Sequence, residues 1–146
     1  MAQSRPHDIR LAGPWGVDWV APEDVPLATL SVGETTFPVD WEAVFGEVYG
    51  TARFTRRFNR PTGLDERTRV WLCVPDYHGM LSVELNHRVL AILPEEDLPV
   101  RIDITESIRP HNRLVLEVTS GPATETVEKA SDERQPVALS IVEETQ

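Results

Sequence analysis

The sequence predicts one all-β domain, an antiparallel β-sandwich of about eight strands with one or two short helical turns. Most apolar residues fall in short runs that alternate with polar residues, which is the period of a half-buried strand. Pairs of turn-forming residues separate several of these runs at hairpin spacing. Twelve of the 146 residues are proline, and no apolar pattern of helical period exceeds about three turns.

The chain opens with a pair of short strands or one bent strand. We expect residues 1–8 to form a flexible N-terminus and residues 9–146 to form a single domain. The odd-numbered residues from Ile9 to Trp19 are apolar apart from one glycine. Because alternate residues of a strand share a face, this parity turns Trp15 and Trp19 towards the core.

A hairpin and a short helix are expected next. The runs Ala28–Val32 and Thr35–Val39 flank Gly33-Glu34. Two residues that include glycine, between runs rich in Thr and Val, indicate a tight hairpin loop. Asp40 is a candidate N-cap for a helical segment over Trp41–Phe45.

Two longer strands follow. The even-numbered residues from Ala52 to Phe58 share one face of the first strand. The second, Arg69–Val74, is a nearly continuous apolar run, which indicates a strand covered on both faces. Cys73, the single cysteine of the chain, is therefore expected to be a small buried core residue.

A second hairpin is predicted around Asn86-His87. Leu81–Leu85 alternates between apolar and polar residues, and an apolar run resumes over Val89–Leu93. Asn and His both tolerate positive φ, as a two-residue loop requires. This loop sets a register of three cross-strand pairs: Leu85 with Arg88, Val83 with Leu90, and Leu81 with Ile92.

Three further strands are predicted over Val100–Ile104, Leu114–Val118 and Pro136–Val142. Between the first two, Thr105–Ile108 has the character of one helical turn, which Asp103 or Thr105 could cap. Residues 121–135 contain almost no apolar side chain, so we expect a long loop there.

Two motifs follow one another in the second half of the chain: L-N-H-R-V-L at Leu85–Leu90, and D-I-T-E-S-I-R-P-H-N-R-L-V-L-E-V at Asp103–Val118. Upstream are F-P-V-D-W at Phe37–Trp41 and Y-G-T-A-R-F-T-R-R-F at Tyr49–Phe58. Together they resemble the amino-terminal sugar-binding domain of family 2 glycoside hydrolases, the β-galactosidase and β-glucuronidase group. That domain has V-P-x-x-W, G-x-A-x-Y-R-R-x-F, an L-N-G hairpin, F-D-I-T, a one-turn helix and P-G-x-N-x-L-x-V-x-V. The resemblance covers Ile9–Val118 and implies a galactose-binding-like jelly-roll sandwich.

Charge and composition narrow the classes of partner. The net charge of −10 argues against nucleic acids and anionic membranes, because both attract a basic face. No apolar run approaches the roughly 18 residues of a membrane span, and the first ten residues lack the apolar stretch of a signal peptide. We therefore expect a cytoplasmic protein. Three arginines form either a small basic face or charges paired with acids: Arg53, Arg57 and Arg69.

No constellation of residues indicates catalysis. The family that the chain resembles hydrolyses glycosides with two glutamates in a separate barrel domain, and we expect this chain to end before such a barrel. The resemblance therefore implies a non-catalytic module without a cofactor. The acidic cluster Glu95-Glu96-Asp97 is expected to be a solvated loop, with a cation site as the alternative. The four histidines lack metal-ligand spacing, so we expect no metal site.

Six residues in or beside two loops form the candidate ligand-binding site: Trp41, Glu47, Tyr49, Asp76, Tyr77 and His78. Aromatic side chains can stack on sugar rings, and binding residues concentrate in loops. Trp41 and Tyr77 could instead be packing residues. The resemblance implies sugar contact through the loop Glu42–Thr51, which contains neither Asn nor Asp. It also implies contact through Thr119 and Ser120, the two residues after the predicted strand Leu114–Val118.

We therefore expect a non-catalytic carbohydrate-binding-like module that binds a mono- or oligosaccharide. The alternative is a protein-interaction or structural module, a homodimer or an accessory subunit, with no sugar ligand. A sandwich with a long exposed sheet edge favours the alternative, because such an edge tends to be covered by a partner. Neither reading includes a nucleic acid or a membrane.

Overall fold

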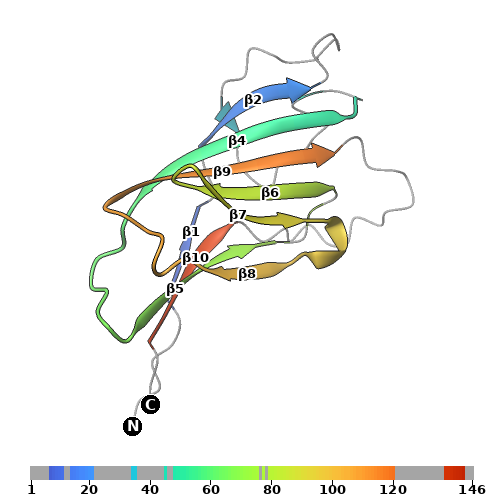
Figure 1. Cartoon of the computed structure of the whole chain (residues 1–146). Helices are drawn as coiled ribbons and strands as arrows, with labels where there is room; N and C mark the ends of the chain where they lie inside the picture. Colours follow the sequence, from blue (N-terminus) through green and yellow to red (C-terminus); the bar gives the residue numbers. More distant parts are fainter. Residues whose placement is uncertain are drawn as a thin grey trace.

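Two antiparallel sheets make up the described part of the molecule (Figure 1). The computed structural model describes residues 7–11, 14–21, 34–35, 45, 48–75, 77, 79–120 and 137–143. Within these residues there are ten strands and one 3₁₀ helix. The predicted all-β antiparallel sandwich is confirmed, with more strands than the eight or so that the pattern suggested.

The smaller sheet has four strands in the order β1-β10-β5-β8. Their bounds are β1 His7–Arg10, β10 Ala138–Glu143, β5 Thr68–Val74 and β8 Val100–Asp103. The larger sheet has six strands in the order β3-β2-β4-β9-β6-β7. Their bounds are β3 Glu34–Thr35, β2 Trp15–Ala21, β4 Gly50–Asn59, β9 His111–Ser120, β6 Met80–Leu85 and β7 Arg88–Leu93. The 3₁₀ helix η1, Glu95–Asp97, lies between β7 and β8 in the chain.

One hydrophobic core fills the space between the sheets, because alternate residues of each strand face inwards. The predicted core side chain Trp15 is fully buried, and its indole Nε1 donates to the carbonyl oxygen of Leu11 at 2.7 Å. Trp19 packs partly buried against the core, with its ring centroid 5.0 Å from that of Phe45. Burying each large apolar side chain stabilises the fold by about 1.5–3 kcal/mol.

The prediction that the run Arg69–Val74 is covered on both faces is wrong. Val70, Leu72 and Val74 are buried, but the residues between them are only partly buried. Trp71 and Cys73 lie on the outer face of the smaller sheet, where the described residues provide no second layer. The guanidinium of Arg101, 5.0 Å from the Trp71 ring centroid, covers part of that ring through a cation–π contact.

The hairpin at Asn86-His87 is confirmed, but its predicted register is only partly right. Asn86 and His87 have φ of 52° and 71°, as a two-residue loop requires, and Leu85 pairs with Arg88. The predicted pairs of Val83 with Leu90 and Leu81 with Ile92 are wrong. A bulge inserts one residue into β7, so the register shifts by one: Val83 pairs with Ala91, Ser82 with Ile92, and Leu81 with Leu93.

Several other boundaries differ from the predictions. His7 and Asp8, expected in the flexible terminus, lie in β1 and pair with β10. Glu34, expected in a hairpin loop, lies in β3, where pairing with Gly16 satisfies its backbone instead. Phe45 is helical, and the rest of the predicted helix lies outside the described residues.

The predicted helical turn after β8 is a hydrogen-bonded turn. The carbonyl oxygen of Ile104 accepts from the backbone N–H groups of Ser107 and Ile108 at 2.9 and 3.1 Å. Asp103 caps it as expected, since its Oδ1 accepts from the backbone N–H of Thr105 at 3.0 Å.

Candidate functional site

Three segments that are distant in sequence meet at one end of the larger sheet. Gly50, the first residue of β4, pairs with Ser120, the last residue of β9. Met80, the first residue of β6, pairs with Thr119. The chain entering β4 and the chain entering β6 therefore flank the end of β9, and we call this region the β9 end (Figure 1).

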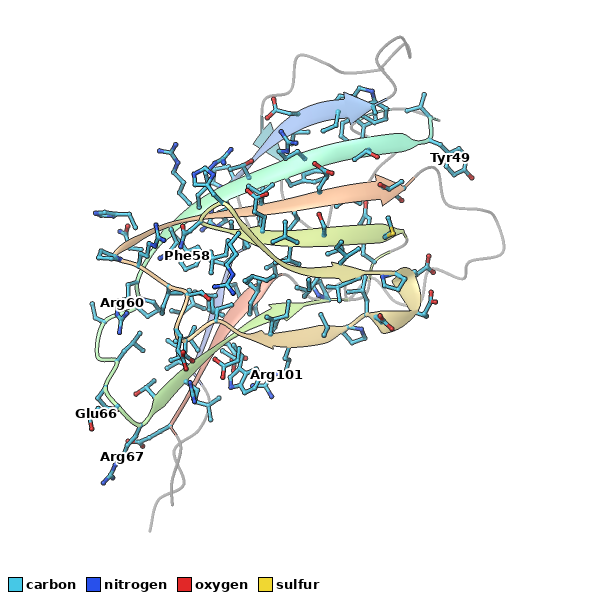
Figure 2. The ribbon with its side chains drawn as sticks, viewed as in Figure 1. Tyr49, Phe58, Arg60, Glu66, Arg67 and Arg101 are labelled. Carbon is cyan, nitrogen blue, oxygen red and sulfur yellow. The ribbon has the colours of Figure 1, made fainter. Side chains whose placement is uncertain are left out.

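Tyr49 is the most prominent side chain at the β9 end. It precedes β4 directly, and 65% of its surface is exposed. Figure 2 shows its ring projecting from this end of β4, with Phe58 at the opposite end of the same strand. Its exposed aromatic ring can stack on an apolar ligand face, and its hydroxyl can donate or accept a hydrogen bond.

Two threonine hydroxyls lie next to this tyrosine along the sheet. Thr51 of β4 and Thr119 of β9 form a cross-strand pair, and their Oγ1 atoms are 2.9 Å apart. Both side chains reach solvent on the outer face. A hydroxyl carries one donor and two acceptor positions, so this pair keeps hydrogen-bonding capacity for a ligand.

Gly79 lets the segment before β6 pass close to the end of β9. Its φ is +132°, and a Cβ atom there would stand 2.5 Å from the carbonyl oxygen of Thr119 and 2.8 Å from Cβ of Ser120. Its backbone N–H donates to Oε1 of Glu95 at 3.1 Å, which ties the segment to η1. Any side chain at this position would push the segment away from β9.

The structure places two of the six predicted site residues. Tyr49 is exposed at the β9 end, whereas Tyr77 is partly buried and packs against the core, which was its alternative reading. Tyr77 stands three residues before β6, so its segment reaches the same end of the sheet. The remaining four lie outside the described residues: Trp41, Glu47, Asp76 and His78. A role in binding stays a prediction for all six.

Sequence reasoning missed two contributors to this end of the sheet, Gly79 and Glu95. The sequence predicts only a solvated acidic loop around Glu95, and nothing local in the sequence links this residue to a glycine sixteen residues earlier. The strand order brings them together, and that order is not written in any single segment. Thr119 and Ser120, expected in a loop after the strand, are the last two residues of β9 itself.

The basic face proposed for Arg53, Arg57 and Arg69 does not form. Arg53 lies in the larger sheet and pairs with Glu117 at 3.0 Å. Arg69 lies in the smaller sheet, 3.7 Å from a carboxylate oxygen of Asp103. The alternative reading, in which such arginines pair with acids, holds for these two.

Two carboxyl groups of the described residues have a shifted pKa, and both shifts are downward. Partial burial raises the pKa of Asp103, but hydrogen bonds from Thr105 and the charge of Arg69 outweigh it, so the pKa lies below its usual 3.8. The pKa of Asp65 is lowered by hydrogen bonds from the Thr68 hydroxyl and the Arg67 backbone. Neither group resembles a general acid, which requires a raised pKa.

Among the residues that the structure describes, no group of three or more His, Cys, Asp or Glu side chains is arranged to hold a metal ion. Within the same ranges, no helix has the length and apolar character needed to cross a membrane.

Comparison with solved structures shows which proteins share this fold. A β-glucuronidase from an uncultured Clostridium species superposes with a TM-score of 0.70 at 16% identity, over 99% of this chain and 30% of that chain. A β-glucuronidase from Bifidobacterium dentium, complexed with coumarin-3-O-glucuronide, gives 0.69 at 17% identity, over 98% and 31%. A rhamnosidase from Novosphingobium sp. PP1Y gives 0.61 at 18% identity, over 97% and 16%.

The resemblance to this group of glycoside hydrolases, predicted from the sequence motifs, is confirmed for the fold. The chain spans less than a third of the length of each of these enzymes, so it corresponds to a domain-sized part of them. No protein-family model matches the chain, and no curated protein sequence matches it.

Proposed function

We propose that this chain is a non-catalytic carbohydrate-binding module whose ligand occupies the β9 end of the larger sheet. The observation that carries the proposal is the exposed ring of Tyr49 beside the hydroxyl pair of Thr51 and Thr119. A sugar ring has an apolar face for an aromatic side chain and equatorial hydroxyls for neighbouring polar groups. The β9 end offers both kinds of partner side by side.

The fold supports this proposal. The solved structures that share it include two β-glucuronidases and a rhamnosidase, and all three names describe enzymes that act on sugars. The matched region is a minor part of each, which supports a binding rather than a catalytic role for this region. The lowered pKa values of Asp65 and Asp103 point the same way, because neither group is suited to protonate a leaving sugar.

Charge favours neutral sugars over uronic acids. The chain carries a net charge of −10, and the carboxylate of Glu95 lies at the β9 end. An anionic uronate approaching this end is repelled, whereas a galactoside or a rhamnoside is not. We therefore expect neutral glycosides to bind more tightly than glucuronides.

A calorimetric titration of the purified protein tests the proposal. Methyl β-galactoside, methyl α-rhamnoside, methyl β-glucuronide and short oligosaccharides form the panel, with hits found first by thermal shift. Replacing Tyr49 with alanine should weaken the best neutral ligand at least tenfold, or about 1.4 kcal/mol. The control is Trp71→Ala, which removes the partly exposed aromatic ring of the other sheet and should leave the affinity unchanged. Equal losses from both variants, or no binding by any sugar, would overturn the proposal.

A further inference from the structure

Strand β7 forms an open edge of the larger sheet. In the described part of the chain, no strand pairs with its outer side. The other sheet edges are shorter, since β3 has two residues and β1 and β8 have four each, against six in β7. An unpaired edge presents backbone N–H and C=O groups that can pair with another strand.

This edge lacks the usual protection against pairing. Soluble proteins place charges or proline on long edge strands, but β7 reads R-V-L-A-I-L and is charged only at its first residue, Arg88. Val89 and Ile92 are 56% and 66% exposed. These are two of the four large apolar side chains that stand exposed among the described residues.

The bulge in β7 turns both exposed residues to the same face. Val89 pairs with Glu84 and Ile92 pairs with Ser82, and these two polar residues lie on the outer face of β6. In a regular strand, residues three apart would point to opposite faces. The extra residue of the bulge lies between them and brings both side chains to the same face, so Val89 and Ile92 form one apolar stripe along the edge.

The backbone of Val89 also faces outwards. Leu85 and Arg88 close a two-residue hairpin loop, so their backbone groups face each other across the hairpin. Because these groups alternate in direction along a strand, those of the next residue, Val89, face the open side. The edge therefore offers backbone pairing and apolar contact at one position.

We propose that a second copy of this chain pairs with it antiparallel along β7, with a two-fold axis at the bulge. Val89 and Ile92 stand on either side of the bulge, so the axis sets Val89 of each copy opposite Ile92 of the other. Each contact buries one exposed β-branched side chain against another, and such cross-strand pairs stabilise a sheet. The two larger sheets then continue as one across the interface.

Charge complementarity favours a second copy of this chain as the partner and favours the antiparallel orientation. Antiparallel pairing places Arg88 of one copy near the far end of β7 in the other, where the acidic helix η1, Glu95–Asp97, begins. A parallel arrangement would bring the two Arg88 side chains together instead. The net charge of −10 per chain opposes unspecific association, so a local cation–acid match is needed for two copies to meet.

The dimer is expected to be weak and to leave the ring of Tyr49 free. A six-residue strand is about 20 Å long, and pairing on that scale falls at the small end of specific interfaces. We therefore expect a dissociation constant of about 10–100 μM. Tyr49 directly precedes β4, and β4 lies three strands away from β7, so the sugar-stacking ring lies outside the dimer interface. The helix η1 is shared, since Glu95 contacts the segment of Gly79 whereas Glu96 is the acid tested against Arg88.

Sedimentation equilibrium of the full chain from 5 μM to 1 mM tests the proposal. The mass should rise from 16.4 kDa towards twice that value as the concentration increases. Ile92→Lys should hold the protein at the monomer mass, although the added lysine lowers the net repulsion between copies. Tyr49→Lys is the matched control, because Tyr49 is 65% exposed and receives the same new charge away from the edge. It should dimerise like the wild type.

A charge-swap experiment tests the antiparallel orientation of the two β7 strands. Arg88→Glu should weaken the dimer at least fivefold, Glu96→Arg should weaken it too, and the double variant should recover most of the affinity. Both substitutions lie at exposed side chains, so folding should be retained. A wild type that stays monomeric at 1 mM, or a dimer that survives both Ile92→Lys and Arg88→Glu, would overturn the proposal. Ile92→Lys should leave sugar affinity unchanged, which separates a failure here from a failure of the carbohydrate site.

Discussion

Asn86 and Asn112 are joined by a hydrogen bond between their side chains, in which Nδ2 of Asn86 donates to Oδ1 of Asn112 at 3.0 Å. Asn86 sits in the β6–β7 turn, and Asn112 lies near the start of β9. Both belong to the motifs that resemble the glycoside hydrolase domain. The bond shows that these motifs meet in space, where they join a turn of the edge hairpin to a central strand.

Further bonds extend this contact. Oδ1 of Asn112 accepts from the backbone N–H of Arg109 at 2.7 Å, and its Nδ2 donates to the carbonyl oxygens of Arg109 and Phe58 at 2.7 and 3.3 Å. Asn86 exchanges bonds with the backbone of Arg113, both at 2.9 Å. Together they fix the turn before β9, the edge hairpin and the end of β4 relative to one another.

Asn112→Ala should lower the free energy of unfolding by about 2–3 kcal/mol, because it leaves several buried backbone groups without partners. Asn112 is 3% exposed, so water cannot replace the lost amide. Urea denaturation measures the change. Asn59→Ala, at an exposed asparagine of β4, serves as the control and should cost less than about 0.5 kcal/mol. Similar losses from the two variants would contradict a structural role for the network.

His87→Gly should stabilise the protein. His87 has a φ of 71°, a conformation that glycine adopts without the steric cost that a side chain incurs. We expect a gain of about 0.5–1 kcal/mol in the free energy of unfolding, measured by urea denaturation. His87→Ala removes the same imidazole but keeps a Cβ atom, so it should give no gain. Stabilisation by alanine as well would show that the ring, not the backbone, is the source of strain.

Gly79→Ala should destabilise the fold and weaken sugar binding together. The new Cβ would meet the Thr119 carbonyl oxygen at 2.5 Å, so the segment must move away from the β9 end at a cost of about 2–4 kcal/mol. Gly63→Ala is the control, because its φ is also positive, +81°, but nothing lies within 4 Å of the added atom. It should cost about 1 kcal/mol and leave sugar affinity intact. Equal effects of the two substitutions on both readouts would show that the close approach to β9 is unimportant.

Asp103 should make stability depend on pH in the acid range. Its pKa is lower in the folded state than the usual 3.8, so its carboxylate contributes stability above that value and loses it as pH falls through the folded pKa. The side chain is 35% exposed, and solvent screening limits the contribution to about 1 kcal/mol. Asp103→Asn should therefore be less stable than the wild type at pH 7, and the difference should shrink below pH 3.8. A difference that stays constant between pH 7 and pH 2.5 would contradict this role.

Alternation along the chain was sufficient to predict the fold class, the hairpin at Asn86-His87 and the burial of Trp15. Two features of the strands could not be read from it. The bulge in β7 places one extra residue opposite the step from Val83 to Glu84, and R-V-L-A-I-L contains no residue that marks it. Trp71 stands in a continuous apolar run, so the pattern gave no sign that its face is the outer one.

The candidate site was harder to predict than the fold. Tyr49 is exposed, as a binding residue must be, and its role in binding stays a prediction, but its neighbours depend on the strand order β4-β9-β6. That order brings Thr119 of β9 next to Thr51, and it brings the segment of Gly79 across the end of the sheet. Such proximity comes from long-range pairing, and a single sequence gives no measure of it.

Mapping a sugar onto the backbone amides by NMR tests the central claim most directly. During titration of ¹⁵N-labelled protein with the best neutral glycoside, resonances from the three segments of the β9 end should shift with one common binding curve: Tyr49–Thr51, Gly79–Met80 and Thr119–Ser120. Amides at the opposite end of the same sheet, such as that of Asn59, should not move. Shifts centred on the outer face around Trp71, or no shifts at any sugar concentration, would contradict a carbohydrate site at the β9 end.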